Sequence, residues 1–307
     1  RVARMRQLGQ VMLTRFAGKS ILPVAGVAGG FSKPMLEAER RELAADAQVL
    51  LDFAAYALEY AKGSVFSRFR DEMQSLGAIT TGFLGAVDAQ GNLRLYDGLL
   101  RLMRPDGDFV DFPASDYERH LAEQVEPWSY AKMVYAKSWG EGFSLNPTAP
   151  MGVYRVNTLA RLNVCDQIAT PRAQAELEAF RERFGRPAQG TLLYHWARLI
   201  ELVHACERAL ELLADDRITA PQARLPAQPA AGRGIGHVEA PRGTLIHDYT
   251  TDDNGCITRA NLIVGTTHNI APMNLSVHQA AARLIADGEV DEEILNRIEM
   301  AIRAYDP

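Results

Sequence analysis

A regular apolar pattern in residues 190–214 constrains this chain more than any other feature. Apolar side chains recur there at alternating steps of four and three residues: Leu192, Trp196, Leu199, Val203, Cys206, Leu210 and Leu213. This spacing places the side chains on one stripe of an α-helix. Because three heptads are few for a free coiled coil, the pattern predicts a central helix whose stripe packs against other helices of a bundle.

Other stretches also have helical spacing. Apolar residues between Lys33 and Lys62 recur at three- and four-residue steps, with Ser32 as the expected N-cap and Pro34 in the first turn. Shorter helices are predicted over residues 171–184, 274–286 and 291–304. Helices therefore account for most of the regular structure.

Two stretches carry turn and strand signals instead. Residues 82–112 alternate short apolar runs, including Leu93–Tyr96, with glycine- and aspartate-rich turns, which predicts a small antiparallel meander. Two apolar segments, residues 243–247 and 257–264, flank the turn sequence TDDNG at 251–255, which predicts a β-hairpin over residues 243–264. We therefore expect a predominantly helical α+β fold, a long-helix bundle with small antiparallel β elements, in one domain over residues 1–307.

Composition excludes several functional classes. The net charge is −5, and 23% of the 307 residues are charged, with both signs mixed along the chain. This distribution builds no basic stripe for nucleic acid. No apolar run is long enough for a membrane span, and the basic N-terminal residues precede no signal-peptide core. We expect neither a nucleic-acid partner nor a membrane span.

The three cysteines, Cys165, Cys206 and Cys256, are far apart in the sequence. Their odd number argues against a disulfide framework, and no pair has the C-x-x-C spacing of a metal or redox site. We therefore interpret them as isolated structural thiols and expect a reducing, cytoplasmic location.

Several residues invite a functional interpretation that their context does not support. His195 and His204 are nine residues apart, on opposite sides of the predicted helix, so they cannot share a metal. No carboxylate at ligand spacing accompanies His237, His247 and His268. The glycines of residues 232–236 precede a predicted strand rather than a helix, so we interpret that run as a flexible linker and not a phosphate loop.

Glu239–Gly243, the sequence EAPRG, is more informative. Pro241 restricts the residue before it to extended geometry, and Gly243 permits close approach of another segment. Arg242 offers a permanently charged planar fork of donors, which suits either an anionic ligand or a structural carboxylate. Physical reasoning alone leaves both roles open.

Several segments, taken in order along nearly the whole chain, resemble the large subunit of a nickel–iron hydrogenase. The match is nearest to the cytoplasmic, cofactor-coupled branch, which is NAD-reducing, heterodisulfide-reductase-linked or deazaflavin-reducing. The matching segments are Leu95–Gly98, Glu126–Tyr130, Tyr154–Val156, Leu159–Asn163, His195–Glu201, Glu239–Leu245, Asn261–Val264 and Ala301–Pro307.

The resemblance implies reversible oxidation of H2 at a nickel–iron centre with cyanide and carbon monoxide ligands, held by four cysteine thiolates. Electrons would pass to an iron–sulfur small subunit, then to further electron-transfer subunits. By the same resemblance, Arg242 and Asp306 are the expected catalytic residues above the metals. The backbone carbonyl of Leu262 would contribute to a buried magnesium site. The expected active-site pocket consists of Ala240, Pro241, Thr266 and Thr267.

The departures from the family pattern are equally clear. The family's C-x-x-C pairs, one near its N-terminus and one directly after the Asp-Pro that stands here at 306–307, are absent from this sequence. Soft thiolates select nickel and iron, so we expect the chain as given to be metal-free and inactive. Two explanations compete: truncation of a longer protein, and a cysteine-free, non-catalytic interaction subunit. In addition, Asn157-Thr158 stands where Gly-Pro is common.

Overall fold

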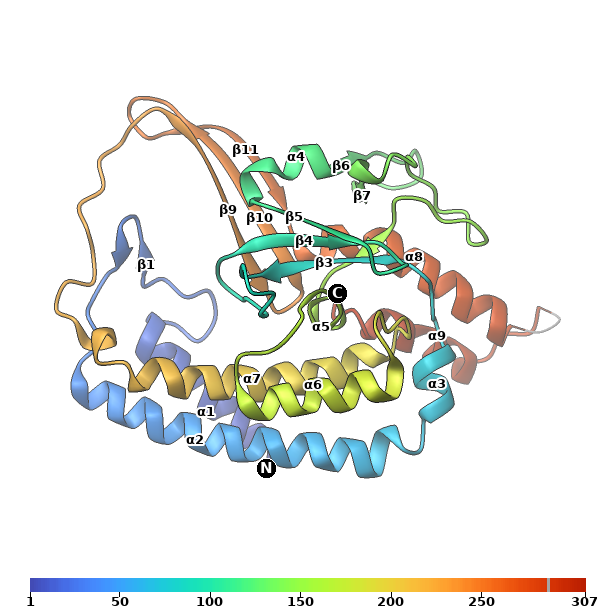
Figure 1. Cartoon of the computed structure of the whole chain (residues 1–307), viewed down its shortest axis with the longest axis horizontal. Helices are drawn as coiled ribbons and strands as arrows, with labels where there is room; N and C mark the ends of the chain where they lie inside the picture. The colour runs from blue at the N-terminus through green and yellow to red at the C-terminus, as the bar shows by residue number, and fades with distance from the viewer. Residues whose placement is uncertain (286–287) are drawn as a thin grey trace.

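The computed structural model describes residues 1–285 and 288–307. Long helices form one layer along one side of the molecule, drawn in the lower half of Figure 1. Within this layer α2 packs against α7, while α1 covers α2 and α6 covers α7. The helices of the layer are α1 (Val2–Ala17), α2 (Glu37–Tyr60), α6 (Pro171–Phe184) and α7 (Leu193–Ala214).

The predicted heptad stripe is the buried face of α7. Trp196 is 3% exposed and stacks on Phe66 with ring centroids 4.9 Å apart, in the largest apolar cluster of the protein. Phe66 belongs to a π-helical segment, Ala61–Phe66, that continues α2 and is followed by α3 (Arg70–Ser75). The prediction of a central bundle helix is confirmed.

The start of α2 differs from the prediction. Ser32 is not its cap, because the helix begins at Glu37 and Leu36 is the N-cap residue. Glu39 accepts a hydrogen bond from the Leu36 backbone N–H at 3.0 Å, so a glutamate in the first turn satisfies a backbone donor at the helix start. Ser32 to Met35 lie ahead of the helix and outside any regular element.

A four-stranded sheet packs over the helical layer, with strand order β5-β4-β3-β8. The predicted meander is present, but its second strand is Leu99–Met103 and not Leu93–Tyr96. Of the latter stretch, Leu93 makes an isolated bridge to Val87. The apolar run that continues through residues 99–103 is buried against β3, and this tertiary burial decides the strand. The strands are β3 (Gly82–Val87), β4 (Leu99–Met103), β5 (Phe109–Phe112) and β8 (Tyr154–Arg155).

A second sheet, β11-β10-β9, projects from the body of the molecule (Figure 1). β10 (Gly243–Thr251) and β11 (Ile257–Ile263) flank the predicted turn. The third strand, β9 (Gly232–Ala240), contradicts our interpretation of residues 232–236 as a flexible linker. Gly232, Gly234 and Gly236 pair with Thr251, Tyr249 and His247, so ladder hydrogen bonds to β10 hold a segment of low strand propensity.

Two C-terminal helices pack on each other beside the central sheet. α8 (Gly265–Leu284) begins nine residues before the predicted start at 274 and includes Pro272, and α9 (Glu292–Arg303) lies near the predicted range. The predicted end of the first helix at residue 286 lies outside the described residues. Between the layers lies α5 (Thr158–Val164), all of whose residues are buried.

The remaining elements are short connections. Among the described residues, no helix combines the length and apolarity that a membrane crossing requires. The whole arrangement is α+β with small, mainly antiparallel sheets, as predicted, although β8 pairs with β3 in parallel. The short elements are β1 (Gly26–Val27), β2 (Gly30–Phe31), α4 (Tyr117–His120), β6 (Leu121–Gln124), β7 (Met133–Ala136) and the 3-10 turns Ala114–Asp116, Lys137–Trp139 and Asp216–Thr219.

Candidate active site

The EAPRG sequence forms the tight turn between β9 and β10. Ala240 pairs with Gly243, so Pro241 and Arg242 are the two residues at the tip of the turn. Gly243 has φ +128°, and a Cβ there would lie 2.2 Å from Cγ2 of Val156. Only glycine combines this backbone conformation with this close approach. The turn is therefore pressed against the segment that leads into α5.

Arg242 meets the C-terminal segment of the chain. Its Nε donates a hydrogen bond to the backbone carbonyl of Asp306 at 2.7 Å, and its Nε lies 3.8 Å from the Asp306 carboxylate. Both side chains are about half exposed, at 55% and 50%. The structure thus brings together the two residues predicted as catalytic, which are 64 positions apart in the sequence.

The first turn of α8 lies against the same hairpin turn. A Cβ added at Gly265 would lie 2.7 Å from the carbonyl oxygen of Arg242. Thr266 and Thr267 follow directly and are half-buried, as is Ala240, whereas Pro241 is exposed. The four predicted pocket residues therefore lie on two elements in contact at Arg242–Gly243.

Arg161, a buried arginine to which sequence reasoning assigned no role, holds the turn through hydrogen bonds. Arg161 in α5 makes a bidentate ion pair with Glu201 at 2.6 and 2.7 Å. Its Nη1 donates to the Glu239 carboxylate at 2.9 Å and to the Ala240 carbonyl at 3.0 Å. Glu239 also accepts a hydrogen bond from Thr244 at 2.7 Å. One guanidinium group therefore ties the β9 side of the hairpin turn to α7, and Thr244 links the β10 side to it through Glu239.

Burial governs the charges of this network. It raises the pKa of Glu239, against the opposing effect of Arg161. Burial alone would lower the pKa of Arg161, but Glu201 and Glu239 outweigh it and raise that pKa. Arg161 therefore stays charged, and its two carboxylates compensate a cation that is 1% exposed. All three residues lie in segments that carry the family resemblance, but no local pattern indicates that they meet.

Among the described residues, the histidines lie apart from one another rather than in one cluster. His237 pairs with Ile246 and His247 with Gly236, so these two side chains lie on opposite faces of the sheet. His268 is buried, with Nδ1 2.5 Å from the Tyr154 hydroxyl, and burial lowers its pKa to about 3. His195 and His204 lie on different sides of α7, and Thr170 contacts Nδ1 of His204 at 2.9 Å. Their predicted structural role fits these contacts.

The cysteines are equally dispersed. Cys165 and Cys206 are buried, and burial raises the pKa of each thiol to about 11, whereas Cys256 is exposed beside the β10–β11 turn. Leu262 lies on β11 and is 45% exposed. Nowhere in residues 1–285 and 288–307 do three or more His, Cys, Asp or Glu side chains gather as a metal site. The magnesium prediction at Leu262 stays a prediction.

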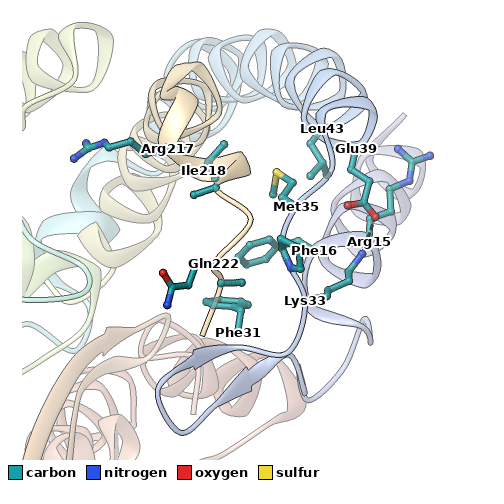
Figure 2. Close-up of a pocket in the computed structure, with 13 residues that line it drawn as sticks. Arg15, Phe16, Phe31, Lys33, Met35, Glu39, Leu43, Arg217, Ile218 and Gln222 are labelled. Carbon is teal, nitrogen blue, oxygen red and sulfur yellow. Dashed lines mark hydrogen bonds and ion pairs between the residues drawn. The ribbon is translucent and has the colours of Figure 1, made fainter. Parts of the chain in front are cut away.

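A separate cavity of about 270 Å³ lies between α1, β2, the segment before α2 and the 3-10 turn after α7. Its cations are already paired: Lys33 contacts Glu39 at 2.7 Å, and Arg15 contacts Glu42 at 3.0 Å. No residue of the Arg242 site lines it. Figure 2 shows its mainly apolar interior, formed by Phe16, Phe31, Met35, Leu43 and Ile218.

Comparison with known proteins decides the family. The chain superposes on a crystal structure of an NAD+-reducing [NiFe]-hydrogenase in the H2-reduced state with a TM-score of 0.90 and 38% identity, covering 99% of this chain and 67% of that one. The chain belongs to the nickel–iron hydrogenase large-subunit family. No protein-family model matches it.

Curated hydrogenase subunits agree with this assignment. A subunit of the F420-non-reducing hydrogenase vhu of Methanococcus voltae is 43% identical over 284 residues, which cover 92% of this chain and 65% of that protein. The beta subunit of the NAD-reducing hydrogenase HoxS of Cupriavidus necator is 36% identical over 318 residues, covering 100% of this chain and 63% of that protein. The chain thus spans slightly less than two thirds of the length of these relatives.

The donor atoms of this hydrogenase-family chain do not fit a nickel–iron centre by themselves. Such a centre needs several soft thiolates at one place. Two of the three thiols here are buried at separate positions, and Arg181 donates to one of them, Cys165, with N–S 3.7 Å. None of the three belongs to the Arg242 turn or the Asp306 segment. The chain therefore presents the protein groups predicted to surround such a centre without the thiolates that would hold it.

Proposed function

We propose that this chain is the part of a nickel–iron hydrogenase large subunit that supplies the outer residues of the active site for reversible oxidation of H2. One observation carries the proposal: the Arg242 Nε–H bonds to the Asp306 carbonyl at 2.7 Å, at a hairpin turn that Arg161 braces. In this proposal Arg242 and Asp306 are the catalytic residues, and Ala240, Pro241, Thr266 and Thr267 line the pocket.

The chemistry of Arg242 supports this role. Its Nε is occupied by the Asp306 carbonyl, while the terminal nitrogens donate to no group in the described part of the chain. A half-exposed guanidinium group on a rigid turn keeps donors available for an anionic or polarisable ligand. The nearby Asp306 carboxylate can accept or return a proton at Oδ2.

The nickel–iron centre would depend on cysteine thiolates in the part of the relatives' length that this chain does not cover. We propose that the centre, with its cyanide and carbon monoxide ligands, and the magnesium ion form in a longer chain of the relatives' length. There the centre would supply the site that splits H2. The partners would be an iron–sulfur small subunit with further electron-transfer subunits, in the cytoplasm.

Elemental analysis with intact mass tests this proposal. The 307-residue chain, purified alone, should contain no stoichiometric nickel, while a longer gene product with its partners should contain nickel and iron and oxidise H2. Replacing Arg242 by Met in that longer protein should abolish H2 oxidation and leave the nickel content unchanged. A longer product that contains nickel but oxidises H2 equally well with this replacement would contradict the catalytic role of Arg242.

A second function is favoured by the dispersed cysteines. A non-catalytic interaction subunit of a redox complex would keep the fold and need no thiolates at the Arg242 turn. The same elemental analysis separates the two functions. A native gene product without added cysteine pairs, assembled with partners but free of nickel, would support the non-catalytic function.

A further inference from the structure

Asn157 lies at the junction of three segments that are far apart in the sequence. It is the N-cap of the buried helix α5, with φ +85°, a backbone conformation that favours glycine. It is fully buried, and its Oδ1 accepts a hydrogen bond from the Thr158 N–H at 2.5 Å. A residue in a conformation unfavourable for its type persists when the surrounding contacts require it.

The Asn157 amide group reaches the C-terminal segment. Its Nδ2 donates to the Tyr305 carbonyl at 2.8 Å. The neighbouring carbonyls have partners from other elements, because Arg198 of α7 donates to Ala304 at 3.0 Å and Arg242 donates to Asp306 at 2.7 Å. Three consecutive backbone carbonyls are thus held by three side chains from three elements.

Asn157 also contacts the turn that carries Arg242. A Cβ added at Gly243 would lie 2.9 Å from the Asn157 backbone nitrogen. One turn further along α5, Arg161 binds the carbonyls of Ala240 and Pro241 at 3.0 and 3.4 Å. The start of α5 therefore touches both segments of the site, the Arg242 turn through its backbone and the Asp306 segment through the Asn157 amide.

We propose that Asn157 is a positioning residue that holds the Asp306 backbone against the Arg242 turn. Its catalytic consequence rests on the proposed hydrogenase function, whereas its structural consequence does not. The middle hydrogen bond fixes the carbonyl between the two held by arginines, so its loss lets Asp306 move relative to Arg242. Because Arg198 and Arg242 remain, the segment loosens without detaching.

The test compares Asn157→Gly with Asn157→Asp in the full chain by hydrogen–deuterium exchange. Glycine adopts φ +85° without strain, so N157G keeps the backbone conformation and removes the side-chain bonds to Tyr305 and to Thr158. N157D keeps an acceptor for the Thr158 N–H and loses only the bond to Tyr305. The Tyr305 and Asp306 amides should exchange about tenfold faster, the effect of one lost buried hydrogen bond. In N157D a carboxylate oxygen faces the Tyr305 carbonyl, so exchange should be faster still.

Two controls make the result specific. The β3 peptide in the same samples should exchange at the wild-type rate, and N146G, the same change in a remote exposed loop, should leave residues 302–307 unaffected. Wild-type exchange at residues 305 and 306 in N157G would overturn the proposal. Equal acceleration in β3, or general unfolding of N157G, would also overturn it, because the loss would then be global.

The assembled, longer hydrogenase gives the catalytic readout. N157G should lower kcat for H2 oxidation about tenfold and leave the KM for H2 within about twofold, as expected when a reacting group is displaced but access is unchanged. Unchanged kcat together with faster exchange would refute the catalytic consequence alone. If the wild-type assembly oxidises no H2, the proposed function fails, while the exchange result still decides whether Asn157 holds the segment.

Discussion

Arg161 and Arg242 act on the same hairpin turn from opposite environments. The Arg161 side chain is 2% exposed and bonds two carboxylates and two backbone carbonyls, so its donors are committed to the protein. The Arg242 side chain is 55% exposed, with one backbone hydrogen bond and a carboxylate at 3.8 Å. The comparison indicates a division of roles, in which the buried cation fixes the turn and the exposed cation remains available to a ligand.

Replacing the buried arginine should have the largest effect on stability. Arg161→Met leaves the buried Glu239 and the partly buried Glu201 without their partner, which should lower the free energy of unfolding by about 3–5 kcal/mol. Urea denaturation measures this change. Lys62→Met, which breaks the more exposed pair with Glu176, is the control and should cost less than about 1 kcal/mol. A similar loss of stability in both variants would mean that the buried Arg161 network stabilises the fold no more than the more exposed ion pair does.

The pH dependence of stability tests whether the fold keeps His195, next to Arg198, in its neutral form. Burial, and then the charge of Arg198, lower the pKa of His195 to about 4, from the usual 6.5. Between these values the unfolded chain binds a proton that the folded chain does not, so stability present above pH 6.5 is lost as the pH falls toward 4. The loss should reach about 3 kcal/mol.

Denaturation at about pH 7 and about pH 4.5 of His195→Gln measures the His195 contribution. The variant should lose less stability on acidification than the wild type. His278→Gln, on the outer side of α8, should follow the wild-type pH dependence. If both variants behave alike, the fold does not hold the partly buried His195 in its neutral form.

The close approach at Gly243 should come next in magnitude. Gly243→Ala places a methyl group 2.2 Å from Val156 at φ +128°, which should cost about 2–3 kcal/mol through overpacking and backbone strain. Gly234→Ala, in the same sheet but facing open space, is the matched control and should be neutral. Thermal unfolding of the two variants gives the comparison, and equal midpoints would show that the turn is not pressed against the segment that leads into α5.

Replacing the exposed arginine should have the smallest effect on stability. Arg242→Met removes one hydrogen bond and one weak, solvent-exposed ion pair, so the free energy of unfolding should fall by less than about 1 kcal/mol. Urea denaturation of this variant and of Arg161→Met under the same conditions measures the contribution of each arginine to the free energy of unfolding. A loss as large as that of Arg161→Met would mean that Arg242 is structural, and its proposed catalytic role would lose its support.

Sequence reasoning succeeded where the signal is local. The stripe of α7 and the range of α6, residues 171–184, follow from side-chain periodicity and from Pro171 at the helix start. It was wrong where tertiary contacts outweigh local propensity. β9 contains three glycines and forms a strand because β10 pairs with it. α8 starts earlier than predicted, at Gly265, which lies against the Arg242 carbonyl.

The candidate site divides in the same way. Arg242 and Asp306 were expected from the family resemblance, and their contact is consistent with that expectation. Arg161 and Asn157 received no predicted role, although Leu159–Asn163 carries part of the resemblance. Their partners are up to 148 positions away, and no periodicity or spacing encodes a contact at that separation.

The sequence by itself determined the helical bundle, the α+β class and membership of the nickel–iron hydrogenase large-subunit family, because amphipathic spacing and ordered motifs are local properties of the chain. Tertiary structure alone decided that one buried helix, α5, joins the Arg242 turn to the Asp306 segment. The physical reason is that burial makes unpaired polar groups costly, so Asn157 and Arg161 are satisfied by distant carbonyls and carboxylates that meet only when the chain is folded.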